Sequence, residues 1–351
     1  MSKTNVFFPC SIHIIHKVNT MNYNLSQSIV NIPFGFYIKT FKPDYNLTRT
    51  LIASIEHFCP NVPIVIIPGD DFKEDSLFGY PTMRSDNPTL TKLIGYFKKL
   101  WCFFGPIERF IYIDSDSLVV RNMNDIFELV RETTMPFTFV CSESKLASPD
   151  QPYEPSQKAF YQSLTGDLEL QQELDPEYDY RGNFPFNTSF IGSHRGAISL
   201  DLLDLTFFKT QALHKALGLP PLNNSREGVF MTDQGLINYL IYKEGIQPVF
   251  LQDVFLYGKK ENDALLKGQM KNHKPYAHAV VTWPGYPRPS VLRKDLAGAD
   301  LWNQFFHQSF SDDTALNHLR ETIRNGSEDI RKRVARRVSK VKRRIMNPNA
   351  R

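Results

Sequence analysis

One stretch decides the fold of this 351-residue chain: Phe110-Ile111-Tyr112-Ile113-Asp114-Ser115-Asp116-Ser117-Leu118-Val119-Val120. Its β-branched and aromatic residues predict a buried strand that ends in acid at Asp114. Side chains two residues apart in extended backbone lie on one face, so Asp114 and Asp116 can approach a single hard cation from the same side. A strand that ends in a solvated Asp-Ser turn would show the same pattern. The choice between a metal site and such a turn depends on the surrounding sequence.

Strands and helices alternate on the N-terminal side of this stretch. Apolar runs at 34–40 and 62–67 predict two buried strands. Between them, apolar side chains spaced three to four residues apart predict a helix that begins at Asn46 as its N-cap and ends before Pro60. A second helical pattern covers 90–101. This order predicts an α/β fold in which helices flank a Rossmann-like, mostly parallel sheet.

Ligands of such open sheets lie beyond the carboxyl ends of the strands. The polar residues that follow the three predicted strands would meet at this edge, and they are Thr40, Asp70, Asp71, Asp114 and Asp116. Their convergence favours a ligand site over a chance Asp-Ser turn.

In the later part of the chain, prolines interrupt the alternation of strands and helices. An acidic stretch with four prolines at 143–183, which contains one helical piece near 156–174, is interpreted as an inserted segment. The elements predicted after it are strands at 184–192, 250–257 and 277–282 and helices at 198–216 and 232–243. The chain then has three expected parts: an N-terminal extension at 1–31, a main domain at 32–310 and a basic helical tail at 311–351.

Charge is divided unevenly along the chain. The formal net charge is +4, but residues 331–351 contain ten Lys and Arg and no acid, which leaves 31 basic against 37 acidic groups in the rest, a net charge of about −6. Four scattered cysteines form no zinc or disulfide pattern and fit a reducing compartment. The first twenty residues lack the apolar core of a signal peptide, and no stretch is apolar for long enough to span a membrane. We therefore expect a cytoplasmic protein.

Three segments, in this order, resemble the retaining glycosyltransferases of family 8, which include glycogenin and bacterial lipopolysaccharide galactosyl- and glucosyltransferases. The first joins Leu90-Thr91-Lys92-Leu93 to the acid stretch and then to Asn124-Asp125-Ile126-Phe127. The second is Pro185-Phe186-Asn187-Thr188-Ser189-Phe190-Ile191, similar to the family's Phe-Asn-Ser-Gly strand. The third is Thr232-Asp233-Gln234-Gly235-Leu236-Ile237-Asn238, close to the family's Asp-Gln-x-x-x-Asn signature. The resemblance spans roughly residues 34–305 and implies the A-type glycosyltransferase fold, a single nucleotide-sugar-binding α/β domain.

The resemblance also implies roles for matched positions. Asp114 and Asp116 match the pair that binds the metal and the nucleotide, and Mn²⁺ or Mg²⁺ is the expected ion for oxygen ligands. The expected catalytic residues, beside the anomeric carbon and the sugar, are Asp233, Gln234 and Asn187. The residues expected to bind the donor nucleotide are Lys39, Thr40, Tyr45, Lys92, Asp114 and Ser115. The alternative interpretation of Asp233 and Gln234 is a helix N-terminus, in which Thr232 or Asp233 is the cap and Gln234 is exposed to solvent.

The match departs from the family near its C-terminal end. There the family carries His-x-x-Gly-x-x-Lys-Pro, whose His completes the metal shell, whereas this chain has Thr282-Trp283-Pro284-Gly285-Tyr286-Pro287-Arg288-Pro289. Arg288 replaces a lysine and can bind phosphate in a fork, with Gly285 beside it in the donor site. Thr282 is no equivalent of a histidine. The third metal ligand is therefore His278 in a shifted loop, the Thr282 hydroxyl or a water.

The tail predicts a cationic amphipathic helix. Its apolar residues recur every three or four positions in one narrow stripe: Ile330, Val334, Val338, Val341 and Ile345. Such a helix suits an anionic membrane surface or nucleic acid, and a solvated helix packed on the body would look the same. The acidic body and the ordered site motifs argue against a nucleic-acid-binding protein. Peripheral contact with the cytoplasmic face of a membrane is one expected use of the tail.

These observations favour one enzymatic function. We expect a metal-dependent retaining hexosyltransferase that takes its sugar from a nucleoside diphosphate donor, UDP-linked, and transfers it to a carbohydrate, glycolipid or protein acceptor. The segment at 143–183 is expected to face that acceptor. The alternatives are a related nucleotidyl enzyme with the same acid pair, a non-catalytic sugar-nucleotide-binding protein, and a protein that binds nucleic acid or membrane through its tail. The choice of sugar and acceptor depends on the shape of the loops, which no motif specifies.

Overall fold

The structure is a computed structural model. It describes residues 23–24, 31–132, 137–139, 162, 165–179, 186–221, 228–230, 232–251, 254–257, 279–282 and 302–306. Three residues of the expected site, His278, Gly285 and Arg288, lie outside the described residues. So do the basic tail at 311–351 and much of the segment at 143–183.

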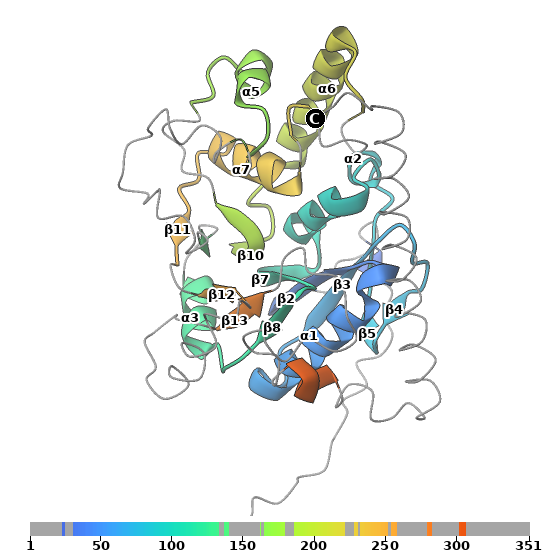
Figure 1. The fold of residues 1–351 in the computed structure, drawn as a ribbon, viewed down its shortest axis with the longest axis vertical. Coiled ribbons are helices and arrows are strands. Elements are labelled where there is room, and N and C mark those ends of the chain that lie inside the picture. Colours follow the sequence, from blue (N-terminus) through green and yellow to red (C-terminus); the bar gives the residue numbers. More distant parts are fainter. Residues whose placement is uncertain are drawn as a thin grey trace, which may run out of the picture.

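A six-stranded sheet forms the centre of the molecule (Figure 1). In spatial order its strands are β11 (Val249–Phe250), β9 (Phe137–Phe139), β10 (Asn187–His194), β7 (Ile107–Asp114), β2 (Ile32–Thr40) and β3 (Ile64–Pro68). Neighbouring strands are parallel except where β10 meets β9 and β7. The mostly parallel sheet expected from the sequence is confirmed, and the first three predicted strands are β2, β3 and β7.

A smaller sheet begins just after the acid end of β7. Strand β8 (Ser117–Val119) follows β7 after a turn formed by Ser115 and Asp116. It pairs antiparallel with β13 (Val280–Thr282), which pairs parallel with β12 (Phe255–Tyr257). Two short ladders, β1 (Tyr23–Asn24) with β6 (Met83–Arg84) and β4 (Ser76–Leu77) with β5 (Tyr80–Pro81), complete the strands described. The acid turn therefore lies where the two larger sheets meet.

The first two helices differ from the predicted ones. Helix α1 (Tyr45–Phe58) begins one residue before Asn46, so the predicted Asn46 cap is wrong. The cause is the preceding 3-10 turn η1 (Lys42–Asp44), in which Pro43 already holds the backbone near helical geometry. The helix predicted at 90–101 is divided into α2 (Pro88–Thr91) and the 3-10 helix η2 (Gly95–Phe104). One continuous helix is interrupted just before Gly95, the first residue of η2, because its φ of 57° lies outside the right-handed helical region.

The later helices agree with their predictions. Helix α6 (Leu200–Leu217) and helix α7 (Asp233–Lys243) match the predicted helices at 198–216 and 232–243. The Ser199 side chain caps α6 by accepting a hydrogen bond from the Leu202 amide, and Gly218 ends α6 with a φ of 67°. Helix α3 (Asn124–Glu132) lies against β7, and helix α5 (Leu168–Leu174) lies against α6.

Apolar side chains cover both faces of the sheet. Tyr37, Phe110 and Tyr112 point to one face and pack with η2, α6 and α7. Ile38 and Ile111, one residue along, point to the other face and pack with α1 and α3. This alternation with a period of two is what burial on both sides of a parallel sheet requires. The core therefore positions the strand ends rigidly from both faces.

The described part of the expected insertion, residues 165–179, belongs to the core. Leu168 and Leu174 are buried in the same cluster as α6 and α7. The Asp175 carboxylate forms an ion pair with Lys243 of α7 at 2.7 Å. Residues 165–179 therefore pack with the core on the side of α6 and α7. Whether the rest of the segment faces an acceptor stays a prediction.

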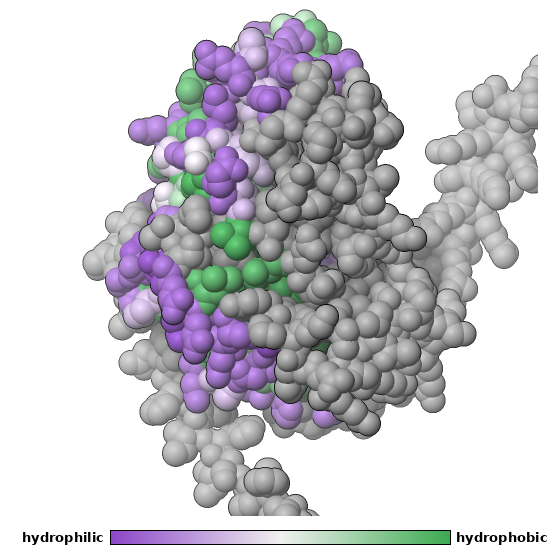
Figure 2. Space-filling view, turned by 90° about the vertical axis from the view of Figure 1, so that its left-hand side faces the viewer, coloured by the Kyte–Doolittle hydropathy of each residue, from purple (hydrophilic) through white to green (hydrophobic). Residues whose placement is uncertain are grey.

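The surface carries its apolar residues in restricted places. On the side that bears β11 and α3, hydrophobic residues gather in the middle, with hydrophilic ones above and below (Figure 2).

Cys59 and Cys102 are buried free thiols, as expected for small apolar residues of the core. Among the described residues, no helix has the length and apolar character that crossing a membrane requires.

Candidate active site

The acid pair lies at the carboxyl end of β7, beside the end of β2. Asp114 is the last residue of β7 and pairs in register with Lys39 of β2. Its Oδ1 accepts a hydrogen bond from the Tyr112 hydroxyl at 2.6 Å and lies 3.1 Å from Lys99 Nζ. Burial alone would raise the pKa of Asp114, but the Lys99 charge and the Tyr112 hydrogen bond hold that pKa below its ordinary value. Asp114 therefore stays charged at the edge of the sheet.

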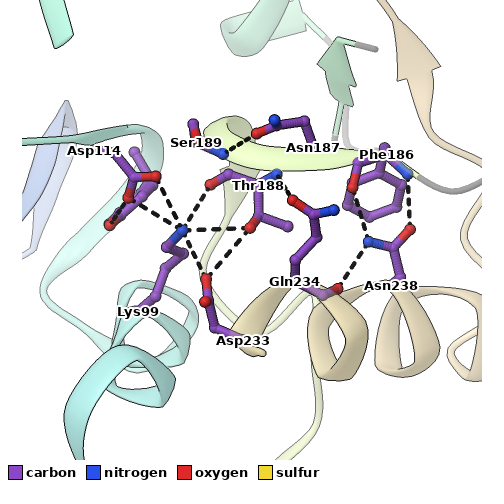
Figure 3. A network of polar contacts seen from close by, with 10 residues as sticks. Lys99, Asp114, Phe186, Asn187, Thr188, Ser189, Asp233, Gln234 and Asn238 are labelled. Atoms are coloured by element: carbon purple, nitrogen blue, oxygen red, sulfur yellow. Dashed lines mark hydrogen bonds and ion pairs between the residues drawn. The ribbon is translucent and has the colours of Figure 1, made fainter. Parts of the chain in front are cut away.

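Lys99 joins two carboxylates that come from different parts of the chain (Figure 3). It stands on η2 with a side chain that is only 6% exposed, and its Nζ lies 2.7 Å from Asp233 Oδ2 at the start of α7. The same Nζ donates to the main-chain oxygen of Thr188 at 3.1 Å. Burial alone would lower the pKa of Lys99, but the charges of Asp114 and Asp233 raise it above its ordinary value. One cation thus links β7, β10 and α7.

Strand β10 and helix α7 are joined by further polar contacts (Figure 3). The Thr188 amide donates to Gln234 Oε1 at 3.4 Å. Asn238, one turn further along α7, accepts from the Phe186 amide and donates to the Phe186 carbonyl, each at 2.9 Å. Thr232, in the N-cap position of α7, makes no side-chain cap bond. The capped helix start with a solvated glutamine, which was the alternative for this motif, does not describe α7.

Asp116 lies in the turn after β7 and is crowded by other carboxylates. Burial, followed by the charges of Asp114 and Asp44, raises the pKa of Asp116 to about 7. Buried carboxylates crowded in this way fit a divalent cation with oxygen ligands, and Mg²⁺ is commonly held by one or two carboxylates with substrate phosphates. Among the described residues, no group of three or more His, Cys, Asp or Glu side chains could hold a metal. The acid pair alone would supply only part of the shell of such an ion, so other ligands would have to complete it.

Thr282 lies beside the acid turn. It pairs with Ser117 in the ladder between β13 and β8, and its hydroxyl is 3.4 Å from the main-chain oxygen of Asp116, to which it donates. Of the candidates for the third metal ligand, the Thr282 hydroxyl is thus next to the turn, whereas His278 lies outside the described residues. The identity of that ligand stays a prediction.

Lys39, at the end of β2, is a buried lysine in a different environment. It is 5% exposed, and its Nζ lies 3.7 Å from the centre of the Phe41 ring and 4.7 Å from the centre of the Tyr96 ring. These contacts are of the cation–π type. Burial lowers the pKa of Lys39 to about 7, although the charge of Asp233 acts in the opposite direction. Within the part of the chain that the structure describes, Lys39 makes no ion pair, so its charge is available to an anionic ligand.

The other expected donor and sugar residues lie around the same edge of the sheet, and they are Thr40, Tyr45, Ser115 and Asn187. Tyr45 packs against Phe78 with ring centres 4.6 Å apart. Asn187 Oδ1 accepts a hydrogen bond from the Ser189 amide at 2.7 Å, which shapes the start of β10. The fold therefore brings together strand ends that are far apart in the sequence.

Lys92, the lysine expected to face the donor, is found in a different contact. Its Nζ forms an ion pair with Asp204 of α6 at 3.2 Å, and the two side chains are 46% and 54% exposed. Lys99, in a second Lys-Leu pair of the same segment, stands between the two carboxylates. The sequence feature that could have identified Lys99 is the apolar stretch around it, from Phe97 to Phe103, which predicts that Lys99 is buried. A buried lysine needs a carboxylate partner, so this feature would have pointed to an ion pair.

No protein-family model matches the sequence, and a search of curated protein sequences finds no match. Solved structures with a similar fold include the galactosyltransferase LgtC in complex with donor and acceptor sugar analogs (TM-score 0.46, 12% identity, 82% of this chain and 99% of that chain covered). They also include the bifunctional glycosyltransferase WbbM (TM-score 0.48, 11% identity, 84% of this chain and 52% of that chain covered). A further one is mouse xyloside xylosyltransferase 1 (TM-score 0.40, 10% identity, 72% of this chain and 98% of that chain covered). At these scores and identities the similarity transfers neither a site nor a substrate to this chain.

Proposed function

We propose that this chain is a metal-dependent retaining hexosyltransferase with a UDP-linked sugar as its donor. The observation that supports this most directly is the position of Lys99, which joins Asp114 of the acid pair to Asp233 beside Gln234. The acid pair suits a cation and a diphosphate, and the start of α7 offers polar groups to a sugar. Transfer from a nucleoside diphosphate sugar requires such neighbouring sites for diphosphate and sugar.

On the donor side, Asp114 and Asp116 would hold Mn²⁺ or Mg²⁺. Such an ion, when bound, stabilises the negative charge that develops on the departing diphosphate. Lys39 adds a positive charge at the same edge, because it pairs in register with Asp114 and has no carboxylate partner among the described residues. Gly285 and Arg288, which lie outside the described residues, remain part of the proposed donor site.

On the sugar side, the proposal assigns Asp233, Gln234 and Asn187 to the transferred hexose. The Asp233 carboxylate is engaged by Lys99 and by the Thr188 hydroxyl, which leaves it poorly suited to act as the base that an inverting enzyme needs. In a retaining transfer the bond from C1 to the diphosphate oxygen breaks, and C1 bonds to the acceptor oxygen on the same face. The acceptor proton passes to the diphosphate. The engaged state of Asp233 supports retention over inversion.

The test is the substitution Asp116→Asn, which keeps the shape of the side chain and removes its charge. With Mn²⁺ present, we expect hydrolysis of UDP-sugars to fall by a factor on the order of 10² to 10³, the usual cost of losing one electrostatic stabiliser. Asp125→Asn is the matched control, because it removes a carboxylate from α3 whose ion pair is with Arg121. Wild-type hydrolysis that ignores a chelator, or an equally small effect of both substitutions, would contradict the metal role.

A non-catalytic sugar-nucleotide-binding protein is the second candidate. Thr282 favours it, since this residue stands where the resemblance expects a metal-binding histidine. Thermal unfolding measured with a panel of sugar nucleotides, with and without Mn²⁺, detects binding for both candidates. Stabilisation by a sugar nucleotide without hydrolysis or transfer would favour the binding protein.

The acceptor and the cellular location belong to the proposal on sequence grounds alone. A carbohydrate, glycolipid or protein acceptor remains proposed, with the segment at 143–183 on its side. The basic tail is proposed to touch the cytoplasmic face of an anionic membrane, where each Lys or Arg contributes roughly 1 kcal/mol. Such a contact would bring a membrane-bound acceptor to the site.

A further inference from the structure

Thr188 connects the side chains of the candidate site (Figure 3). It is 1% exposed, and its polar atoms reach two other elements. Its main-chain oxygen accepts from Lys99 Nζ at 3.1 Å, and its hydroxyl oxygen lies 3.3 Å from that Nζ and 3.4 Å from Asp233 Oδ2. Its amide donates to Gln234 Oε1. Thr188 therefore touches η2 and both polar residues at the start of α7.

The position of Thr188 in β10 explains why its main chain is available. The ladder between β10 and β7 begins at Phe190, which pairs with Ile113. Thr188 stands two residues before this pair, so its amide and carbonyl groups bond to α7 and η2 beyond the end of β7. Asn238 holds the same stretch from its other side by bonding both main-chain groups of Phe186.

The Thr188 amide also determines how Gln234 is turned. A backbone N–H donates only to an acceptor, so it is the side-chain oxygen of Gln234 that faces the Thr188 amide. Asn238 Nδ2 donates to the Gln234 main-chain oxygen at 2.8 Å, which fixes the first turn of α7. The side-chain oxygen of Gln234 is thereby held against β10.

We propose, on the basis of the function proposed above, that Thr188 is a positioning residue that holds Lys99, Asp233 and Gln234 in one arrangement for the transferred sugar. Thr188 touches no substrate in this proposal. It acts by keeping the lysine between its two carboxylates and the side-chain oxygen of Gln234 against β10. Its hydroxyl serves the lysine and Asp233, and its backbone serves Gln234.

The first test replaces the hydroxyl and keeps the volume. The Thr188 hydroxyl contacts two charged groups at distances longer than those of strong hydroxyl hydrogen bonds, so Thr188→Val should lower kcat roughly tenfold. KM for the UDP-sugar should stay within about twofold, because no group that touches the donor is removed. Thr188→Ser keeps the hydroxyl and should restore kcat to within about threefold of wild type.

Thr210→Val is the matched control. Thr210 is fully buried in α6, and its hydroxyl donates to the Thr206 main-chain oxygen at 2.7 Å, so the change costs a buried hydrogen bond away from the site. Thr210→Val should lower the Tm but leave kcat unchanged. An unchanged kcat in Thr188→Val, a Ser variant as slow as the Val variant, or an equal loss in Thr210→Val would overturn the proposal.

A second measurement separates this inference from the proposed function, because it needs no activity. Thr188→Val and Asp233→Asn, combined in one protein, should lower the Tm by less than the sum of the two single changes, since both weaken the same charge-assisted contact. Thr210→Val combined with Asp233→Asn should be additive. Additive losses in both pairs would overturn the positioning role. A wild type without hydrolysis of any sugar nucleotide would count against the proposed function, while the Tm cycle would still decide the role of Thr188.

Discussion

Two buried lysines lie at the same end of the sheet in opposite environments. The region around Lys99 is ionic, because Asp114 and Asp233 lie on either side of its Nζ. The region around Lys39 is aromatic, because its Nζ lies over the rings of Phe41 and Tyr96. The pKa of Lys99 is raised by its partners, whereas burial lowers the pKa of Lys39 to about 7. Lys99 thus neutralises carboxylates of the protein itself, whereas Lys39 is in a position to pair with an anionic ligand.

This difference indicates that Lys99 stabilises the fold, whereas Lys39 is placed to bind an anionic ligand. A buried cation between two carboxylates is stabilised only as long as all three charges are present. A buried cation whose direct contacts are aromatic rings is costly in the free protein, and it gains a direct partner when an anion enters. The two lysines should therefore respond differently to the same substitution.

The largest effect is expected for Lys99→Met. This change leaves the buried Asp233 and the partly exposed Asp114 without their shared cation, and breaking a buried pair typically costs about 3–5 kcal/mol. The free energy of unfolding in urea measures it. Adding Asp233→Asn should recover part of the loss, since one of the two uncompensated charges is then gone. A loss below about 1 kcal/mol would show that Lys99 is no ionic anchor.

Lys39→Met should act on binding and not on folding. Removing a buried charge that has no carboxylate partner among the described residues should leave the free energy of unfolding unchanged or raise it. The affinity for UDP should fall on the order of tenfold, because one cation near the diphosphate is lost. Calorimetric titration with UDP measures the affinity, and Lys39→Arg serves as the variant that retains the charge. Destabilisation as large as that of Lys99→Met would remove the contrast between the two lysines.

The pH dependence of stability sharpens the contrast further. Lys39 has a folded pKa of about 7, below its ordinary value of 10.5. The cost of burying its charge is therefore fully present below pH 7 and shrinks as the pH rises toward 10.5. The stability gain from Lys39→Met should therefore be largest near pH 6 and smaller at pH 9. Lys99 has a raised folded pKa, so its contribution should stay constant over this range. Urea unfolding of the wild type and both Met variants at three pH values provides the check; a gain that grows with pH would contradict the assignment to Lys39.

The smallest effect is expected for Lys92→Ala. Its ion pair with Asp204 is about half exposed, and such pairs contribute roughly 0–1 kcal/mol. Donor hydrolysis should stay within about twofold of wild type, since Lys99 and not Lys92 stands between Asp114 and Asp233. A tenfold loss of hydrolysis without a loss of stability would assign Lys92 to the donor site after all.

The elements that could be predicted are those whose signal is local. Strand β7 and helices α6 and α7 agree with their predicted ranges, because burial leaves a period of two or of three to four residues in the sequence itself. The start of α1 and the division at Gly95 were missed. Both depend on backbone geometry set by single residues, Pro43 and Gly95, which apolar periodicity does not record.

Part of the candidate site was also predictable. Asp114, Asp233 and Gln234 lie close to one another, as the ordered motifs indicated, and Lys39 lies at the same edge of the sheet. Lys99 was not among the predicted residues. Asp114 is 15 residues away along the chain, but Thr188 is 89 residues away, and no pattern within one segment reports such a contact.

By itself, the sequence determined the order of strands and helices, the acid-ended strand β7 and the polar residues that follow the other strands. The tertiary structure alone decided which lysine stands between Asp114 and Asp233, and that Thr188 joins them to Gln234. The physical reason is the range of the interactions. Periodic burial is a property of neighbouring residues, whereas an ion pair depends on the distance between side chains in space, which the packing of β10 and α7 against η2 sets.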